Sequence, residues 1–173
     1  GITKTGTGTW SLDDVHPYSG DTTVNQGTLE LLSNTYTINQ GGLIITIVEN
    51  GSLPNSRVTV TSQGTLDCSS STKVLAINGN GTIDLNSTLV ADSTGYPSST
   101  FSGTLNGTGQ LTLNGSGQFV FSGNSGNFSG LVTTSSNGVL QAGATRFEDS
   151  LVTITGDNSL DFTSNTTLGQ LGG

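Results

Sequence analysis

The chain has 173 residues and a net charge of −8, from 4 basic and 12 acidic side chains. A chain this acidic is repelled by nucleic acid and by anionic membrane surfaces, so we expect neither as a partner. The only cysteine, Cys68, excludes an intrachain disulfide scaffold, and no apolar run is long enough to predict a membrane-spanning helix.

Charged residues make up only 9% of the chain, against roughly 25% in an average soluble domain. Disordered chains are rich in charge and proline, whereas this chain has 3 prolines and abundant Val, Ile and Thr. The composition favours a thin apolar core shared along a stack of strands. We therefore predict one all-β unit over residues 1–173.

The N-terminal segment alternates short β-prone runs with glycines. Residues 3–5 and 9–12 are rich in β-branched and aromatic side chains and predict strands. Trp10 and Tyr18 are the large apolar side chains that we expect to anchor the core. Turns or close backbone approaches are predicted at four glycines, Gly6, Gly8, Gly20 and Gly27.

The middle of the chain continues as strands, and no segment predicts a helix. Residues 43–48 form the most apolar run, bounded by Gly41-Gly42 and Asn50-Gly51, and predict a buried strand. In residues 57–61, Val58 and Val60 alternate with polar neighbours and share one face. Further strands are predicted at 64–68, 73–77, 81–85, 109–113, 118–121, 138–141, 151–155 and 159–162. Residues 91–100 lack alternation and predict a loop leaving the stack.

The pattern of residues 1–32 recurs at residues 103–141. Residues 111–121 match residues 2–12, although Leu113 replaces the lysine of the first copy. The second copy places six residues at the corresponding positions, Gly115, Gly117, Phe119, Phe128, Gly130 and Gly138. An internal repeat of this kind predicts a stacked solenoid.

Short strands with irregular spacing are typical of a three-faced parallel β-helix, in which turns vary while strands stack. At about twenty residues per coil, the chain holds roughly eight coils in a single stack. Parallel crossovers favour a right-handed path. A β-sandwich is the alternative, but it has fewer and longer strands and does not explain the repeat.

The first copy resembles a known repeat. Residues 1–12, then Tyr18-Ser19-Gly20, then residues 22–29 are similar to the passenger-associated transport repeat of autotransporters. These are type V secreted surface proteins of Gram-negative bacteria. The resemblance implies a right-handed parallel β-helix and an internal segment of a longer passenger at the cell surface. It also implies a C-terminal outer-membrane barrel as a partner outside this segment.

The resemblance further implies a structural or adhesive stalk that presents a binding surface away from the outer membrane. Partners would be ligands on host or neighbouring cells. A separate possibility is assembly, in which exposed end coils and strand edges stack with copies of the chain itself. The alternative is a polysaccharide lyase or hydrolase on the same fold, with Asp67 and Asp84 stacked as a carboxylate pair or calcium site. His16 suggests either a metal or acid–base site with Asp13 and Asp14, or a polar loop, which we favour. We assign no catalytic residue, cofactor or metal.

Overall fold

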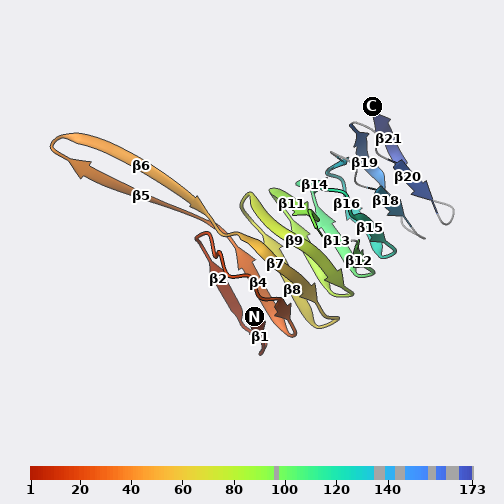
Figure 1. Cartoon of the computed structure of the whole chain (residues 1–173), viewed down its shortest axis with the longest axis horizontal. Helices are drawn as coiled ribbons and strands as arrows, with labels where there is room; N and C mark the ends of the chain where they lie inside the picture. The colour runs from red at the N-terminus through yellow and green to blue at the C-terminus, as the bar shows by residue number, and fades with distance from the viewer. Residues whose placement is uncertain (96–97, 135–138, 143–146, 156–158, 163–167, 173) are drawn as a thin grey trace.

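The computed structural model describes residues 1–95, 98–134, 139–142, 147–155, 159–162 and 168–172. These residues form twenty-one β-strands and no helix, as the sequence predicts. No helix able to span a membrane is found among them. The strands build an elongated stack from which one hairpin projects (Figure 1).

The stack has three faces, and on each face a strand pairs in parallel with strands of the neighbouring coils. Because β7 and β9 are long and bend, their first halves belong to the second face and their second halves to the third. The first face contains β2 (Thr9–Leu12), β4 (Gly27–Leu31), β8 (Gly64–Cys68), β10 (Thr82–Leu85), β13 (Thr104–Gly107) and β16 (Asn124–Phe128).

The second face continues from the first halves of β7 (Leu53–Val60) and β9 (Thr72–Gly79). It contains β11 (Thr88–Asp92), β14 (Gln110–Asn114), β17 (Leu131–Thr134), β19 (Phe147–Ile154) and β21 (Leu168–Gly172). The third face contains β1 (Ile2–Lys4), β3 (Thr22–Val24), the second halves of β7 and β9, β12 (Ser98–Phe101), β15 (Gln118–Phe121), β18 (Val139–Ala142) and β20 (Ser159–Phe162).

The chain visits the three faces in a fixed order. The sequence β10, β11, β12 is followed by β13, β14, β15 and then by β16, β17, β18, with each strand parallel to its counterpart one coil earlier. This confirms the parallel β-helix and excludes the sandwich, whose sheets are antiparallel. About seven coils are present, close to the predicted eight. The right-handed path stays a prediction.

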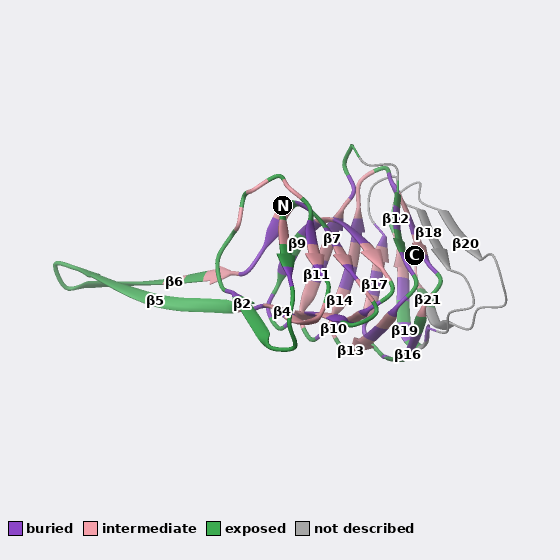
Figure 2. Cartoon of the chain, turned by 90° about the horizontal axis from the view of Figure 1, so that it is seen from below, coloured by how far each residue is buried: buried purple, intermediate pink, exposed green. Residues whose placement is uncertain are grey.

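The core is a set of columns, because the register places equivalent residues above one another. On the first face, Leu29 pairs with Leu66, Leu66 with Ile83 and Ile83 with Leu105. All four are buried, and Figure 2 shows the same alternation of buried and partly exposed positions along the stack. Cys68 belongs to the neighbouring column, and its burial raises the pKa of the thiol. It packs as a small apolar residue, as predicted.

In the second half of the stack, the core is aromatic. The ring of Phe121 lies 5.9 Å from that of Phe101, 6.5 Å from that of Phe119 and 5.6 Å from that of Phe147. Phe128 meets Phe147 edge to face at 6.5 Å. Phe121 therefore contacts the rings of three neighbours and is the centre of this cluster.

The loop predicted at residues 91–100 is shorter than expected. Strand β11 extends to Asp92 and β12 begins at Ser98, so both ends of the predicted loop belong to strands. Ser93 keeps this corner on the stack, because its amide and hydroxyl both donate to the carbonyl of Asn114, each at 3.0 Å. Polar residues in outward strand positions explain why the two ends of this range resemble a loop in the sequence.

We expect Phe121→Ala to lower the free energy of unfolding by about 3–5 kcal/mol, since it removes a fully buried ring from a packed cluster. Urea denaturation followed by circular dichroism measures the change. Phe121→Leu keeps most of the volume and should cost clearly less. Equal unfolding midpoints for the wild type and the alanine variant would contradict the core described here.

Candidate functional site

The largest exposed apolar feature of the described residues is a β-hairpin inserted between β4 and β7. It consists of β5 (Ser33–Gln40) and β6 (Leu43–Asn50), which pair antiparallel along their whole length. Gly41 and Gly42 form its two-residue turn with φ of 60° and 92°. Two successive positive φ values define a type I′ turn, which matches the twist of the flanking strands and is accessible mainly to glycine and asparagine.

The hairpin leaves the stack without interrupting it. The amide of Leu32 donates to the carbonyl of Leu12 at 3.1 Å, and the amide of Gly51 donates to the carbonyl of Leu32 at 2.8 Å. The two ends of the insertion are thus tied together in the ladder of the first coils. Beyond them the hairpin points away from the stack, and its strands are almost entirely exposed (Figures 1 and 2).

One face of the hairpin is continuously apolar. Because cross-strand partners share a face, the register puts Tyr36 beside Ile47 and Ile38 beside Ile45, with Leu43 beside Gln40 at the tip. We call these five residues, Tyr36, Ile38, Leu43, Ile45 and Ile47, the Tyr36 face. The opposite face carries a pair of threonines, Thr37 and Thr46, between two apolar residues, Ile44 and Val48.

The prediction of a buried strand at residues 43–48 is therefore wrong. Leu43 and Ile44 are 62% and 69% exposed. A short β-branched run has the same composition in a buried strand and in a free hairpin. The signal that distinguishes them is Gly41-Gly42 between two β-prone runs of equal length, which is typical of a hairpin with a two-residue turn.

Polar groups gather where the hairpin meets the stack. The hydroxyl of Tyr36 donates to Oε1 of Glu49 at 3.0 Å, and this hydrogen bond raises the pKa of Tyr36. A groove of about 420 Å³ lies between the base of the hairpin and the stack, and Val15, Val48 and Val90 line part of it.

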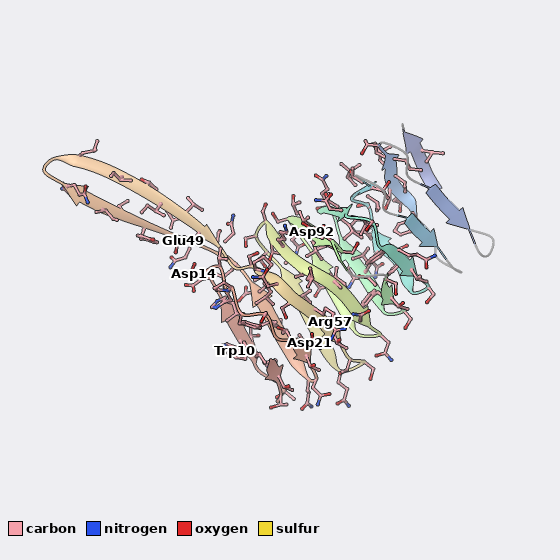
Figure 3. The ribbon with its side chains drawn as sticks, in the orientation of Figure 1. Trp10, Asp14, Asp21, Glu49, Arg57 and Asp92 are labelled. Atoms are coloured by element: carbon pink, nitrogen blue, oxygen red, sulfur yellow. The ribbon has the colours of Figure 1, made fainter. Side chains whose placement is uncertain are left out.

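The groove also contains an ion pair. Lys73 lines the groove and pairs with Asp92 at 2.6 Å, which lowers the pKa of the Asp92 carboxyl. Figure 3 shows Glu49 and Asp14 at this base.

Trp10 does not anchor the core as predicted. It is 41% exposed, although its pairing partner Leu29 is fully buried. Trp10 and Leu12 lie on the same side of β2, which is the edge strand of the first face and has a neighbour only in β4. Leu12 is buried in this position whereas Trp10 is not, and Figure 3 shows Trp10 beside the edge strand β2.

The lysine of the first copy has a structural role that sequence reasoning missed. Lys4 is buried, and its ammonium donates to the carbonyls of Gly6 at 2.7 Å, Gln26 at 3.0 Å and Thr5 at 3.2 Å. It therefore joins the turn after β1 to the turn before β4. Three backbone acceptors satisfy the charge without an acidic partner. In the second copy the apolar Leu113 replaces this lysine and is buried.

Of the first-copy glycines, Gly27 is the most constrained. Its φ is +74°, and a Cβ there would overlap the carbonyl oxygens of Gly6 and Gly8. Gly6 also has a positive φ of 79°, whereas Gly8 has open space around it. A Cβ at Gly20 would overlap the backbone of Gly1.

Tyr18 is partly buried against the core, so the structure places it near its predicted role. Its hydroxyl lies 2.5 Å from Oγ1 of Thr22, which lies 2.8 Å from the hydroxyl of Ser56. Ser56 in turn donates to the carbonyl of Gly20 at 2.8 Å. These hydrogen bonds connect the segment between β2 and β3 to strand β7, which belongs to the next coil.

The second copy repeats the local shape of the first but not its place in the coil. The glycine corner at Gly6 joins the third face to the first, whereas the corresponding corner at Gly115, with φ of 93°, joins the second face to the third.

The other residues of the second copy differ in their surroundings. Phe119 and Phe128 are buried in the core, and the Phe128 ring packs against the backbone of Gly130, where a Cβ would overlap the ring. The amide of Gly117 donates to the Ser93 hydroxyl at 3.1 Å. Gly138 lies outside the described residues.

Asp67 and Asp84 stack on the outer side of the first face, as predicted, and Glu30 extends the column. Each carboxylate accepts a hydrogen bond from a neutral donor: Ser11 to Glu30 at 2.6 Å, Ser69 to Asp67 at 2.8 Å and Asn106 to Asp84 at 2.8 Å. Hydrolytic pairs need one acid and one base in different environments. These carboxylates have alike surroundings, so the column gives the enzymatic alternative no support.

His16 lies in the connection between β2 and β3, where its amide donates to the carbonyl of Ser52 at 2.8 Å. This agrees with the polar loop that we favoured. Its Nε2 is buried without a hydrogen-bond partner. Within the described ranges, no group of three or more His, Cys, Asp or Glu side chains could hold a metal ion.

Residues 2–31 match the family model of the passenger-associated-transport repeat. The match ends with β4, directly before the hairpin. It confirms the resemblance of the first copy to the passenger-associated transport repeat. The second copy at residues 103–141 stays a prediction. Neither the curated proteins nor the solved structures gave a match to the chain.

We expect Gly27→Ala to destabilise the stack strongly. A left-handed backbone costs a non-glycine residue about 1–3 kcal/mol, and the overlap with two carbonyl oxygens adds to this. Gly8→Ala is the matched control, because a Cβ there meets no atom within 4 Å. Thermal unfolding of both variants measures the difference. A Gly27→Ala variant as stable as Gly8→Ala would show that the corner is not fixed as described.

Proposed function

We propose that the chain is a segment of an autotransporter passenger on the surface of a Gram-negative bacterium. In this proposal the β-solenoid is a stiff stalk, and the hairpin at residues 33–50 is its adhesive contact element. The observation that carries the proposal is the match of residues 2–31 to the passenger-associated-transport repeat, in a chain that folds as a parallel stack. A solenoid alone would not indicate this function, because the same fold supports many others.

The stack suits a stalk because its stability is the sum of contacts between neighbouring coils. Each coil offers the next one a row of backbone donors and acceptors and a column of apolar side chains. A coil can therefore fold onto the one before it as soon as it leaves the cell. Outward export and folding would proceed together, without a requirement for contacts between distant parts of the chain.

The hairpin suits a contact element because its apolar side chains stay exposed in the part of the chain that the structure describes. An isolated two-stranded hairpin is marginally stable in water, and soluble proteins seldom expose a continuous apolar face. This hairpin does so while standing clear of the stack (Figure 1). Contact with a partner outside the chain would cover the face and stabilise the hairpin.

Surface presentation can be tested by labelling in cells that produce the protein with its native flanking sequence. A membrane-impermeant maleimide should label a Thr46→Cys variant on intact cells, because Thr46 is exposed on the hairpin. The unchanged protein is the control, since its buried Cys68 should react only after unfolding. Labelling of the variant only after cell lysis would contradict surface presentation.

A further inference from the structure

Strand β6 has a free edge. Cross-strand residues of an antiparallel hairpin alternate between hydrogen-bonded and non-hydrogen-bonded pairs, and a two-residue turn is closed by a hydrogen-bonded pair. Gln40 and Leu43 form that closing pair. Counted from it, Ile44, Thr46 and Val48 stand in non-hydrogen-bonded pairs, so their amides and carbonyls point away from β5. No strand pairs with this edge in the described part of the chain.

The free edge lacks the features that keep such edges from pairing. Native edge strands are usually short, or they carry a charge, a proline or a bulge. Strand β6 has eight residues, an unbroken register with β5, and neither charge nor proline before Glu49. Its outward amides and carbonyls can be satisfied by water or by one further strand. The chemistry of the edge therefore defines its occupant, which is a polypeptide in extended conformation.

The edge continues into the groove at the base of the hairpin. Val48 lines this groove from β6, and Val15 and Val90 line its other side. Ile44 and Val48 are both exposed, and they lie on one face of the hairpin with Thr46 between them. A strand added to β6 would place its own side chains beside Ile44 and Val48, and the side chain beside Val48 would enter the groove.

Charges at the base select a basic strand. Asp14 and Glu49 lie there without a cationic partner among the described residues, since Asp14 accepts a backbone amide and Glu49 accepts the hydroxyl of Tyr36 (Figure 3). The charge of Lys73 is compensated by Asp92. The chain as a whole carries −8, so an acidic strand or a second copy would be repelled. A strand with a lysine or arginine near the base would be attracted.

We propose that the free edge of β6 binds an extended strand of another protein by β-strand addition. This strand carries apolar residues beside Ile44 and Val48, a small residue beside Thr46, and a basic residue at the end that meets the base of the hairpin. Backbone hydrogen bonds supply the affinity, and the groove supplies the specificity. The inference rests on the proposed function only in treating the hairpin as the contact element.

Fluorescence anisotropy of a labelled probe peptide tests the proposal on the purified chain. The probe has about nine residues, with two valines four positions apart, threonines between and beside them, and a lysine at each end. The same peptide with a central proline is the control, because proline interrupts a strand. We expect the probe to bind with a dissociation constant below about 1 mM and the control to bind at least about tenfold more weakly. No saturable binding at about 1 mM would overturn the proposal.

A matched pair of proline variants identifies the edge. Thr37 and Thr46 are cross-strand partners, and both amides point outward, so neither Thr37→Pro nor Thr46→Pro removes a hydrogen bond between β5 and β6. We expect Thr46→Pro to weaken probe binding at least about tenfold and Thr37→Pro to weaken it less than about threefold. Any loosening of the hairpin is common to both variants, so their difference reports the edge. Equal affinities of the two variants would contradict the assignment to β6.

A double-mutant cycle tests the groove without altering the hairpin. Val90→Ser removes an apolar side chain from the stack side, and we expect it to weaken binding of the probe about three- to tenfold. Two further probes each carry serine in place of one valine. The probe that lacks the groove valine should bind equally to the wild-type and Val90→Ser chains. An identical effect of Val90→Ser on all three probes would overturn the placement of the strand.

Other occupants give different results. Binding that is lost in Ile45→Glu but unchanged in Thr46→Pro would place the peptide on the Tyr36 face and overturn strand addition. Dimerisation of the wild-type chain that Thr46→Pro abolishes would make a second copy the occupant and overturn the choice of another protein. Binding is measured on purified protein, so its failure leaves surface presentation untouched. Conversely, failed surface labelling would leave the measured affinities unchanged.

Discussion

Each strand of the stack can bury its apolar side chains only because the equivalent strand of the next coil lies one hydrogen-bonded spacing away. Leu29, Leu66 and Ile83 stack in a column along the axis and belong to one core cluster with residues of the other two faces. The same spacing aligns the carboxylates of Glu30, Asp67 and Asp84 on the outside of the stack. It also aligns the rings of Phe101 and Phe121 on the inside. On the edge strand β2, Leu12 is buried and Trp10 is 41% exposed.

This constraint explains why an insertion can leave the stack without harming it. The ladder continues from Leu12 through Leu32 to Gly51, so the hairpin interrupts no column. Because the hairpin lies outside the stack, its sequence does not have to pack into the core. It is an uncharged strand pair with one apolar face. The stack carries most of the charged side chains, whereas residues 33–48 carry none.

Much of this architecture can be predicted from sequence. Short alternating strands, glycine corners and an internal repeat indicate a parallel solenoid, and Val58, Val60 and Cys68 are buried as their patterns predict. The exposure of residues 43–48 was not predicted, because local composition does not reveal whether a strand has a sheet on its faces. The buried Lys4 was also missed, since its three carbonyl partners come from turns that only the folded coil brings together.

In this structure the hairpin is an appendage of a self-sufficient stack. The most direct measurement replaces residues 33–50 with a short glycine–serine turn between Leu32 and Gly51 and determines the unfolding free energy in urea. Because those two residues are already hydrogen-bonded, the shortened chain should unfold cooperatively within about 1 kcal/mol of the wild type. Loss of cooperative unfolding, or a much lower stability, would show that the hairpin belongs to the core and would contradict the account.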